Sequence, residues 1–440
     1  SSFAQTRNSI GNETPTITDS TYFKAVFNTI QDLIKEGKIV AGHDVASGGL
    51  ITTLLELCFA DTQLGANLDL TDLGESDTIK VLFSENAGIV FQAKDDSIEA
   101  ILKSQHIDAI KIGTVTTEAI LTVRNNEMEM GLNIETLRDT WFKTSYLLDN
   151  QQTANGLAKD RFENYKVQPL AYNFPSSSKI SLPKRSETPN EARPKAAILR
   201  EKGSNSEREM ANAMYLAGFD VKDVHMTDLI SGRENLEDIQ FLGAVGGFSN
   251  SDVLGSAKGW AGAIKYNEKA NTVIKNFFAR PDTLSIGICN GCQLFMELDL
   301  INPDHESHGK MTYNDSHKHE SNFTSVEIQK NNSIMLSSLE GSKLGVWISH
   351  GEGKFTLPLS EKNYDIVAKY GYEGYPANPN GSDFNTAMLC DKTGRHLVTM
   401  PHIERSIFPW NWAHYPKGRN DEASPWLEAF INAKEWLAKK

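Results

Sequence analysis

The stretch Thr283-Leu-Ser-Ile-Gly-Ile-Cys-Asn-Gly-Cys-Gln-Leu-Phe295 changes from one hydrophobic rhythm to another within a few residues. Apolar side chains alternate up to Ile288, which is typical of a strand, and recur at helical spacing after Gly291. The pattern Gly-x-Cys-x-Gly between them is a nucleophile elbow with cysteine in place of serine. Cys289 would lie at a helix N-terminus, where the dipole and free amides favour a thiolate that can attack an acyl carbon. The alternative interpretation is a buried cysteine at a strand end.

Strands and helices alternate around this elbow from about residue 194 onward. We expect strands at 196–199, 219–224 and 241–245, helices at 205–216 and 260–278, then strands at 324–328, 344–349 and 396–400 and a helix at 426–437. This order predicts an α/β fold with a doubly wound, mostly parallel sheet and helices on both faces. Ligands bind such sheets beyond the carboxyl ends of the strands, where Gly246, Gly247 and Cys289 fall.

The first 150 residues predict a separate α+β domain. Its expected helices are 21–36, 50–59, 97–103 and 134–148, and its expected strands are 38–42, 79–83, 88–93, 107–115 and 119–123. Residues 151–193 are punctuated by proline and have little periodicity, so we expect an extended linker there. The predicted organisation is therefore an α+β domain (1–150), a linker (151–193) and an α/β domain (194–440).

The bulk composition is that of a soluble globular protein, with 440 residues, 39% hydrophobic and 23% charged. A net charge of −13 argues against a general nucleic-acid binder. The sequence has no apolar run of membrane-spanning length and no signal peptide, and its four cysteines fit a reducing compartment, so we expect a cytoplasmic protein without a membrane partner. The chain begins with Ser1, and we expect it to be a piece of a longer polypeptide.

A cysteine nucleophile needs a base, a group that orients the base, and donors for the oxyanion. Two histidines have a glutamate two positions later, in His350-Gly-Glu352 and His402-Ile-Glu404, and each follows an expected strand. At the end of an extended segment such a pair points the same way, so spacing alone does not decide between them. The amides of Asn290 and of Gly246-Gly247 could hold an oxyanion, although the two glycines could equally mark a tight turn.

Two further motifs are less decisive. In His43-Asp-Val-Ala-Ser-Gly-Gly-Leu50 a glycine-rich polar turn precedes an apolar helix, which fits an anion or metal-nucleotide site; the alternative is a turn in which Asp44 caps the next element. Cys289 and Cys292 have the spacing of a redox pair or half a metal site, but no second cysteine pair exists in the sequence, which argues against structural zinc. We expect Cys292 to be packed inside the helix.

Several stretches together resemble the glutaminase domain of the large, single-chain phosphoribosylformylglycinamidine synthases, over about 193–440. They are Ala197-Ile-Leu-Arg-Glu-Lys-Gly-Ser-Asn-Ser-Glu-Arg-Glu-Met-Ala211, Gly246-Gly-Phe-Ser249 with Asp252-Val-Leu-Gly-Ser-Ala-Lys-Gly-Trp-Ala261, Cys289-Asn-Gly-Cys-Gln293, His350-Gly-Glu-Gly353 and Met400-Pro-His-Ile-Glu-Arg405. The first 150 residues resemble the end of that family's synthetase region. The resemblance implies a class I glutaminase with Cys289 as nucleophile, His402 as base and Glu404 as its orienting carboxylate. His350 would then contribute to substrate binding.

The same resemblance implies a reaction in which glutamine supplies ammonia for the ATP-dependent conversion of formylglycinamide ribonucleotide to formylglycinamidine ribonucleotide, in purine biosynthesis. Magnesium and ATP or ADP would belong to the full-length enzyme, with Asp44 as a metal ligand of an auxiliary nucleotide site, and the glutaminase step would need no cofactor. The partners would be glutamine and the remaining synthetase domains. Ala46 and Ser47 depart from the family's usual Ser and Asp, and residues 311–323 are unusually rich in Asn and His. The rival interpretations are a cysteine hydrolase or peptidase of the same fold and a latent, non-catalytic ligand-binding fragment.

Overall fold

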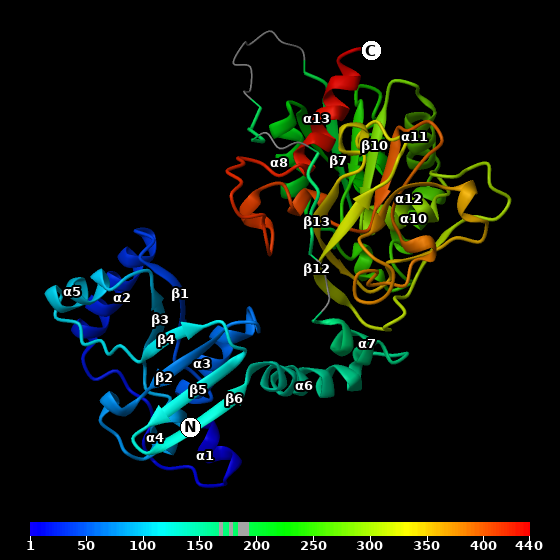
Figure 1. Ribbon diagram of the computed structural model, residues 1–440. Coiled ribbons are helices and arrows are strands. Elements are labelled where there is room, and N and C mark those ends of the chain that lie inside the picture. The colour runs from blue at the N-terminus through cyan, green and yellow to red at the C-terminus, as the bar shows by residue number, and fades with distance from the viewer. Residues whose placement is uncertain (167–169, 176–178, 184–192) are drawn as a thin grey trace. The chain divides into compact units, whose positions relative to one another are not determined.

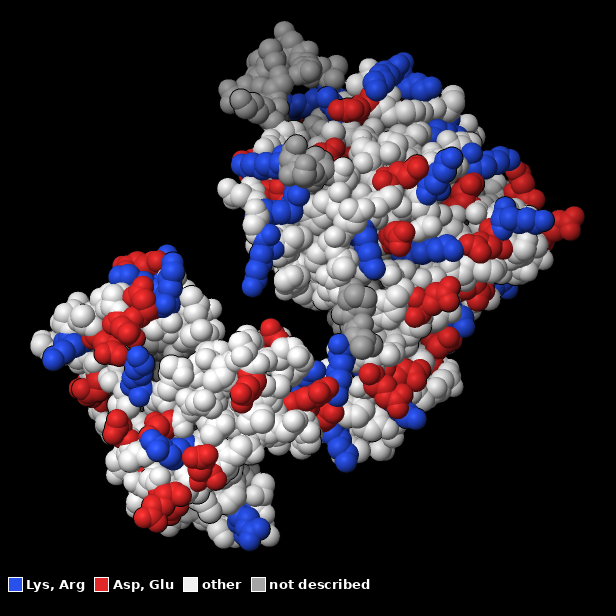
Figure 2. All heavy atoms as spheres, viewed as in Figure 1, with Lys and Arg blue, Asp and Glu red and all other residues white. Residues whose placement is uncertain are grey.

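In the computed structural model, which describes residues 1–440 except 167–169, 176–178 and 184–192, the chain forms two compact units, Ser1–Leu147 and Leu148–Lys440 (Figure 1). Each unit has its own hydrophobic core. Figure 2 shows acidic and basic side chains interspersed over the visible face of each unit. No helix in the described part of the chain is both long and apolar enough to span a bilayer.

The first unit is α+β. Its elements are α1 (Ser2–Thr6), α2 (Ser20–Lys35), β1 (Ile39–Asp44), α3 (Gly49–Phe59), β2 (Gly65–Asp69), α4 (Thr78–Phe83), β3 (Ile89–Ala93), α5 (Ser97–Ser104), β4 (Gly113–Thr116), β5 (Ile120–Asn125), β6 (Met128–Asn133) and most of α6 (Ile134–Gln152). Strands β4-β2-β5-β6 form one sheet, and β1 pairs with β3 in another. Buried side chains of α3 and α4, among them Leu54 and Leu82, share a core with Leu121 and Val123 of β5.

Two expectations for this unit are wrong in detail. Residues 79–83, expected as a strand, form helix α4, because the Asp77 carboxylate accepts the backbone N–H groups of Ile79 and Lys80 and so caps a helix. The strand expected over 107–115 is only β4 in the structure. Strands β2 and β6 are not among the expected elements, although Met128, Met130 and Leu132 of β6 alternate with residues that are not apolar.

The second unit contains a nine-stranded sheet in the order β13-β12-β15-β16-β17-β10-β9-β7-β8. Strands β8, β7, β9, β10 and β17 are parallel, whereas the pairs from β17 to β13 are antiparallel. The expected α/β class is confirmed, and the sheet is mixed. Its strands are β7 (Lys195–Arg200), β8 (Asp220–His225), β9 (Phe241–Ala244), β10 (Leu284–Ile288), β12 (Glu320–Ile328), β13 (Lys343–His350), β15 (Asp365–Tyr370), β16 (Thr386–Cys390) and β17 (His396–Thr399), and β11 (Lys310–Thr312) pairs with β14 (Lys354–Thr356) beside it.

Helices cover both faces of this sheet. Figure 1 shows α8 (Glu207–Ala217) and α13 (Trp426–Leu437) on one face, and α10 (Lys258–Lys265), α11 (Glu268–Ala279) and α12 (Asn290–Glu297) on the other, where α9 (Met226–Ser231) also packs. The single helix expected at 260–278 is divided into α10 and α11, because the Asn267 side chain accepts the N–H of Ala270 and starts a new helix.

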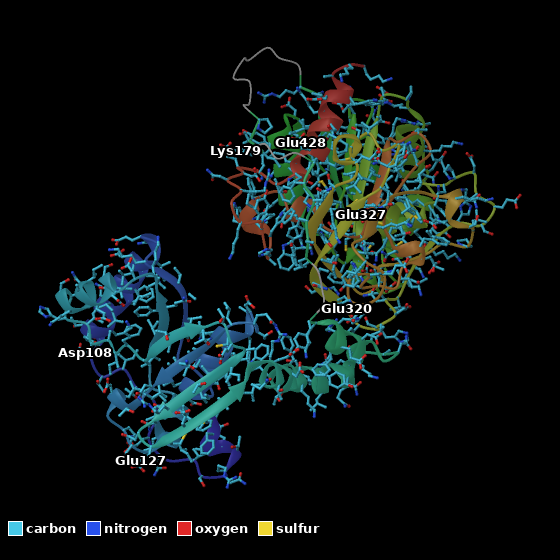
Figure 3. The ribbon with its side chains drawn as sticks, viewed as in Figure 1. Asp108, Glu127, Lys179, Glu320, Glu327 and Glu428 are labelled. Atoms are coloured by element: carbon cyan, nitrogen blue, oxygen red, sulfur yellow. The ribbon has the colours of Figure 1, made fainter. Side chains whose placement is uncertain are left out.

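Part of the expected linker region is helical and is attached to the second unit. Helix α7 (Leu157–Asn164) carries Arg161, whose guanidinium lies 2.9 Å from Asp149 at the end of α6 and 2.9 Å from Glu320 at the start of β12 (Figure 3). The hydroxyl of Tyr375 also donates to Glu320, at 2.9 Å. Because Glu320 is buried, these contacts supply its compensating charge and hydrogen bonds.

Candidate active site

The elbow holds Cys289 in a strained conformation between β10 and α12. Its φ of 52° and ψ of −105° are unusual for a residue with a side chain. A β-carbon at Gly291 would lie 2.1 Å from the carbonyl oxygen of Ala244 on β9, and one at Gly287 would lie 2.6 Å from the carbonyl oxygen of Gly291. The elbow therefore requires both glycines because the helix start packs directly on the neighbouring strand. The N–H of Cys289 donates to Thr399 O at the end of β17, 2.8 Å away.

His402 lies beside Cys289 and is paired with Glu404. The imidazole Nδ1 is 2.7 Å from Glu404 Oε1, and both side chains are buried. Burial alone would lower the pKa of His402, but the Glu404 carboxylate outweighs it and, with a hydrogen bond involving the Cys289 thiol, raises this pKa to about 10. Although burial opposes it, the imidazolium holds the pKa of Glu404 below its usual value. A β-carbon at Gly246 would be 2.9 Å from His402 Cε1 and 3.4 Å from Cys289 Cβ, so this glycine leaves room for both.

His350 is also buried nearby but has no carboxylate partner. Burial, together with repulsion from His402 and His319, lowers the pKa of His350 to about 3, so its imidazole is neutral. The Glu352 carboxylate, two positions later, instead accepts the N–H of Ser256 at 3.1 Å. The structure therefore separates the two His-x-Glu motifs, and only the one at His402 forms a charged pair.

The backbone amides of Asn290 and Gly247 belong to the segments that follow the paired strands β10 and β9. Asn290 is the first residue of α12, so its N–H has no acceptor within the helix. Its side chain is occupied elsewhere, because Oδ1 accepts the N–H of Ser249 at 3.1 Å and Nδ2 donates to Gln293 Oε1 at 2.9 Å. Gly247 follows β9 with a φ of 114°, and a β-carbon there would lie 2.6 Å from Asn205 N. The oxyanion roles expected for these two amides therefore stay predictions.

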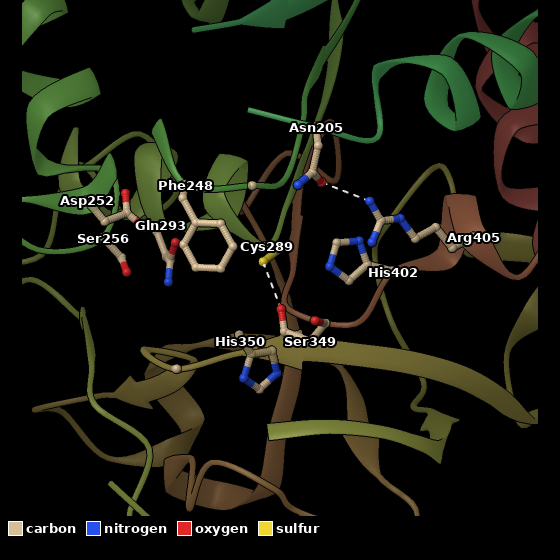
Figure 4. Close-up of a pocket in the computed structure, with 12 residues that line it drawn as sticks. Asn205, Phe248, Asp252, Ser256, Cys289, Gln293, Ser349, His350, His402 and Arg405 are labelled. Atoms are coloured by element: carbon tan, nitrogen blue, oxygen red, sulfur yellow. Dashed lines mark hydrogen bonds between the residues drawn. The ribbon is translucent and has the colours of Figure 1, made fainter. Parts of the chain in front are cut away.

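A pocket with about 370 Å³ of empty space, partly open to solvent, surrounds these groups (Figure 4). It is lined by Asn205, Gly247, Phe248, Asp252, Ser256, Cys289, Gln293, Ser349, His350, Gly351, His402 and Arg405. The thiol of Cys289 lies 3.6 Å from Ser349 O. Burial raises the pKa of the Asp252 carboxyl, which accepts the N–H of Ala257 at 3.2 Å.

Sequence reasoning missed most of these lining residues. Asn205, Phe248, Asp252, Ser256 and Ser349 come from loops or strand ends far apart in the chain, and only the sheet order brings them together. Gln293 had a local signal, because it lies one helical turn after the nucleophile. Its Nε2 donates to Glu352 O at 2.7 Å, which links the elbow helix to the opposite pocket wall.

Neither Cys292 nor Asp44 is among the residues that line the pocket. Cys292 is fully buried in α12, and burial raises the pKa of its thiol well above the usual value. Asp44 ends β1 with a side chain that is 76% exposed, and the N–H of Gly48 in the following turn already donates to Glu85 Oε1 at 2.9 Å. No group of three or more potential metal-ligating side chains occurs in the described residues. Since Mg2+ bound by a protein needs more than one isolated carboxylate, the residues present here do not make a complete magnesium-nucleotide site.

Comparison with known proteins gives matches along the chain. The family described as "CobB/CobQ-like glutamine amidotransferase domain" matches residues 193–437, and "AIR synthase related protein, C-terminal domain" matches residues 1–125. A protein of Arabidopsis thaliana described as "Probable phosphoribosylformylglycinamidine synthase, chloroplastic/mitochondrial" is 38% identical over 463 residues, which cover 99% of this chain and 33% of that protein. The phosphoribosylformylglycinamidine synthase of Homo sapiens is 35% identical over 469 residues, with 98% and 35% covered.

The chain thus spans about a third of the length of these curated relatives. Among solved structures, PurLQS from Thermotoga maritima matches with a TM-score of 0.45 and 23% identity, over 56% of this chain and 100% of that one.

Proposed function

Because the chain belongs to the CobB/CobQ-like glutamine amidotransferase family, we propose that it is the C-terminal part of a phosphoribosylformylglycinamidine synthase and that it hydrolyses glutamine at Cys289. In this proposal residues 194–440 are the glutaminase domain, 1–150 are the C-terminal portion of a synthetase-like domain, and 151–193 connect them. The observation that carries the proposal is the buried chain of Cys289, His402 and Glu404 at the pocket floor.

The first half of the reaction forms a thioester. The Cys289 thiolate attacks the carboxamide carbon of glutamine, and the oxyanion accepts hydrogen bonds from the amides of Asn290 and Gly247. The proton on His402 passes to the leaving nitrogen, so that ammonia departs and a γ-glutamyl thioester remains. The charged Glu404 supports this role because it keeps His402 protonated and fixes its tautomer through Nδ1.

The second half returns the enzyme to its starting state. His402, now neutral, takes a proton from a water molecule that attacks the thioester carbon. Glutamate leaves, and the released thiolate again faces the imidazolium. His350 does not fit the role of base, because its imidazole has no carboxylate to stabilise the charged form; we assign it to binding the substrate as part of the pocket wall.

We extend this proposal to the activity of the whole enzyme. Ammonia would serve the ATP-dependent conversion of formylglycinamide ribonucleotide to formylglycinamidine ribonucleotide in synthetase domains outside this chain. Magnesium and ATP or ADP would act there, and Asp44 would be one ligand of an auxiliary nucleotide site completed by the rest of the polypeptide. The glutaminase step itself needs neither. We place the enzyme in the cytoplasm, without a nucleic-acid or membrane partner.

A diazoketone analogue of glutamine tests the proposal. The analogue should label Cys289 and abolish glutamate release. The Cys289→Ala variant should also release no glutamate. Cys292→Ala is the matched control and should retain most of the activity, since that thiol is buried away from the pocket. Activity that survives in Cys289→Ala but is lost in Cys292→Ala would overturn the assignment of the nucleophile.

A further inference from the structure

The acidic side chain in the pocket wall, Asp252, has no positively charged partner. Asp252 lines the pocket and is half-buried. Its carboxylate accepts the N–H of Ala257 at 3.2 Å, the side-chain amide of Asn290 at 3.4 Å and a hydrogen bond from the Ser256 hydroxyl. All three donors are neutral, and no ion pair joins Asp252 to a basic residue in the described part of the chain. The protein therefore solvates this carboxylate without compensating its charge.

A second carboxylate, that of Glu352, adds to the negative charge here. Glu352 lies in the turn after β13, and it accepts the N–H of Ser256 at 3.1 Å. Burial and the charge of Glu352 raise the pKa of the Asp252 carboxyl, although its hydrogen bonds act in the opposite direction. A cation that brings its own N–H donors would stabilise both carboxylates.

The loop that carries Asp252 is held in an unfavourable backbone conformation. Asn250, Ser251 and Asp252 have φ values of 53°, 58° and 48°, which are left-handed in three consecutive residues that are not glycine. The N–H of Asn250 donates to Lys202 O at 2.7 Å, and the Asn290 side chain ties Asp252 to the first residue of α12. The position of the carboxylate relative to the elbow is therefore fixed by the surrounding structure.

The position of the proposed base indicates where the amino-acid end of a substrate would lie. Figure 4 shows His402 and Arg405 on one side of Cys289, and Asp252 and Ser256 on the other. In the proposed mechanism the carboxamide nitrogen faces His402, which protonates it. Since the nitrogen and the aliphatic chain are different substituents of the same carbon, the chain leads away from His402, towards Asp252.

A second polar group of the same pocket also points to a polar ligand. His350 is 2% exposed, and neither of its ring nitrogens has a hydrogen-bond partner among the described residues. Its neutral imidazole offers one N–H donor and one acceptor, and leaving these buried atoms unpaired is costly. An amino acid carries an ammonium and a carboxylate, so it offers a partner both to Asp252 and to His350.

We propose that the Asp252 carboxylate, supported by Glu352, binds the α-ammonium group of glutamine and so selects an amino acid over other primary amides. This inference rests on the proposed glutaminase function. The α-ammonium group has a full positive charge and three N–H donors, so it supplies the compensation that the neutral donors around Asp252 do not.

A matched pair of substrates tests this role of Asp252. Glutamine and the monoamide of glutaric acid share the carboxamide and the carboxylate, but only glutamine has the α-ammonium group. Asp252→Asn should lower kcat/KM for glutamine about tenfold to a hundredfold, as for one lost hydrogen bond to a charged group, and change kcat/KM for the monoamide less than about threefold. Asp365→Asn is the matched control, because Asp365 on β15 also has a neighbouring carboxylate, Asp391, but lies outside the pocket. It should leave both values unchanged.

Labelling of Cys289 checks the same contact without turnover. The diazoketone analogue of glutamine carries an α-ammonium group, whereas iodoacetamide does not, so Asp252→Asn should slow labelling by the analogue about tenfold or more relative to labelling by iodoacetamide. An equal loss of kcat/KM for both substrates, or an unchanged ratio of the two labelling rates, would show that Asp252 only shapes its loop and would overturn the inference. Glutamate release that persists in Cys289→Ala, or a wild-type Cys289 that the analogue does not label, would instead refute the proposed function, which keeps the two failures distinct.

Discussion

Replacing Glu404 by Gln should remove the charge that keeps His402 protonated while preserving the size of the side chain. The carboxylate lies 2.7 Å from His402 Nδ1 in a buried environment; burial lowers the pKa of His402, but the carboxylate and the neighbouring Cys289 together outweigh it and raise this pKa to about 10. Without the carboxylate, only the contacts with Cys289 oppose burial, which is the largest influence, and we expect the pKa of His402 to fall to its usual value of about 6.5 or lower. At pH ~7.5 the protonated fraction of His402 should then drop from nearly all molecules to about one-tenth or less.

The pH at which the difference appears follows from the direction of this shift. Wild-type His402 is protonated up to about pH 10, whereas in Glu404→Gln it is protonated only below 6.5. The two proteins should therefore react alike only well below pH 6.5 and above about 10, and differ most between these values. Alkylation of Cys289 by iodoacetamide, followed by mass spectrometry, should be at least about tenfold slower in the variant near neutral pH. The kcat/KM for glutamine should fall further, towards roughly 10⁴-fold, because the amide also favours the wrong imidazole tautomer.

Glu234→Gln provides the control for placing an amide at a buried carboxylate. Glu234 is buried, pairs with Lys222 and accepts the N–H of Leu236 at 2.8 Å, outside the pocket. Its variant should alkylate like the wild type. If Glu404→Gln keeps the wild-type alkylation profile and loses less than threefold in kcat/KM, the charge of Glu404 does not set the state of His402, and the mechanism derived from it is wrong.

Three further changes test other parts of the structure. His350→Ala should raise KM for glutamine at least about fivefold with a smaller change in kcat, because His350 belongs to the pocket wall; steady-state kinetics that show only a lower kcat would contradict this role. Gly291→Ala should lower the free energy of unfolding by more than about 3 kcal/mol in denaturant titration, since its β-carbon would lie 2.1 Å from Ala244 O; Gly262→Ala in α10, with its nearest neighbour 4.0 Å away, should be neutral or stabilising by up to about 1 kcal/mol. Calorimetric titration with magnesium-ADP should detect weak binding or none, because the described residues contain no group of three or more potential metal ligands that could include Asp44; tight binding that disappears in Asp44→Asn would show a self-contained nucleotide site.

The sequence could predict the elements whose causes are local. Gly287 and Gly291 around Cys289 are required by a turn that joins one strand to one helix, so the elbow is visible in a few consecutive residues. The same holds for the strand-helix alternation that predicts the α/β fold. The strand predicted at 79–83 is wrong because Ile, Val, Leu and Phe favour a strand, whereas the single Asp77 cap starts helix α4 there. The single helix predicted at 260–278 is wrong for a similar reason, because the Asn267 side chain caps and starts α11.

The pocket could not be predicted in the same way, because its walls are set by strand order. Cys289 follows β10, Gly247 follows β9, and Ser349 with His350 ends β13 at the far edge of the sheet. Hydrophobic periodicity indicates which segments are strands but not the position of β13 relative to β10. The return of β13 to the site depends on the isolated pairing in which His402 N–H donates to Trp347 O at 2.8 Å, and no local sequence signal marks that contact.

The two His-x-Glu motifs show why identical spacing can give opposite chemistry. Both histidines are buried, which alone would leave each of them neutral. At His402 the chain enters a short 3-10 turn, Ile403–Arg405, which brings the Glu404 carboxylate back to Nδ1. The carboxylate then compensates the buried positive charge of the imidazolium. At His350 the strand ends in a glycine-rich turn instead, and Glu352 points to the N–H of Ser256. In the proposed mechanism, the base is therefore selected by the backbone path after the histidine: a turn that closes on the ring stabilises an imidazolium, which we propose protonates the leaving ammonia, whereas a turn that opens leaves a neutral ring, to which we assign substrate binding.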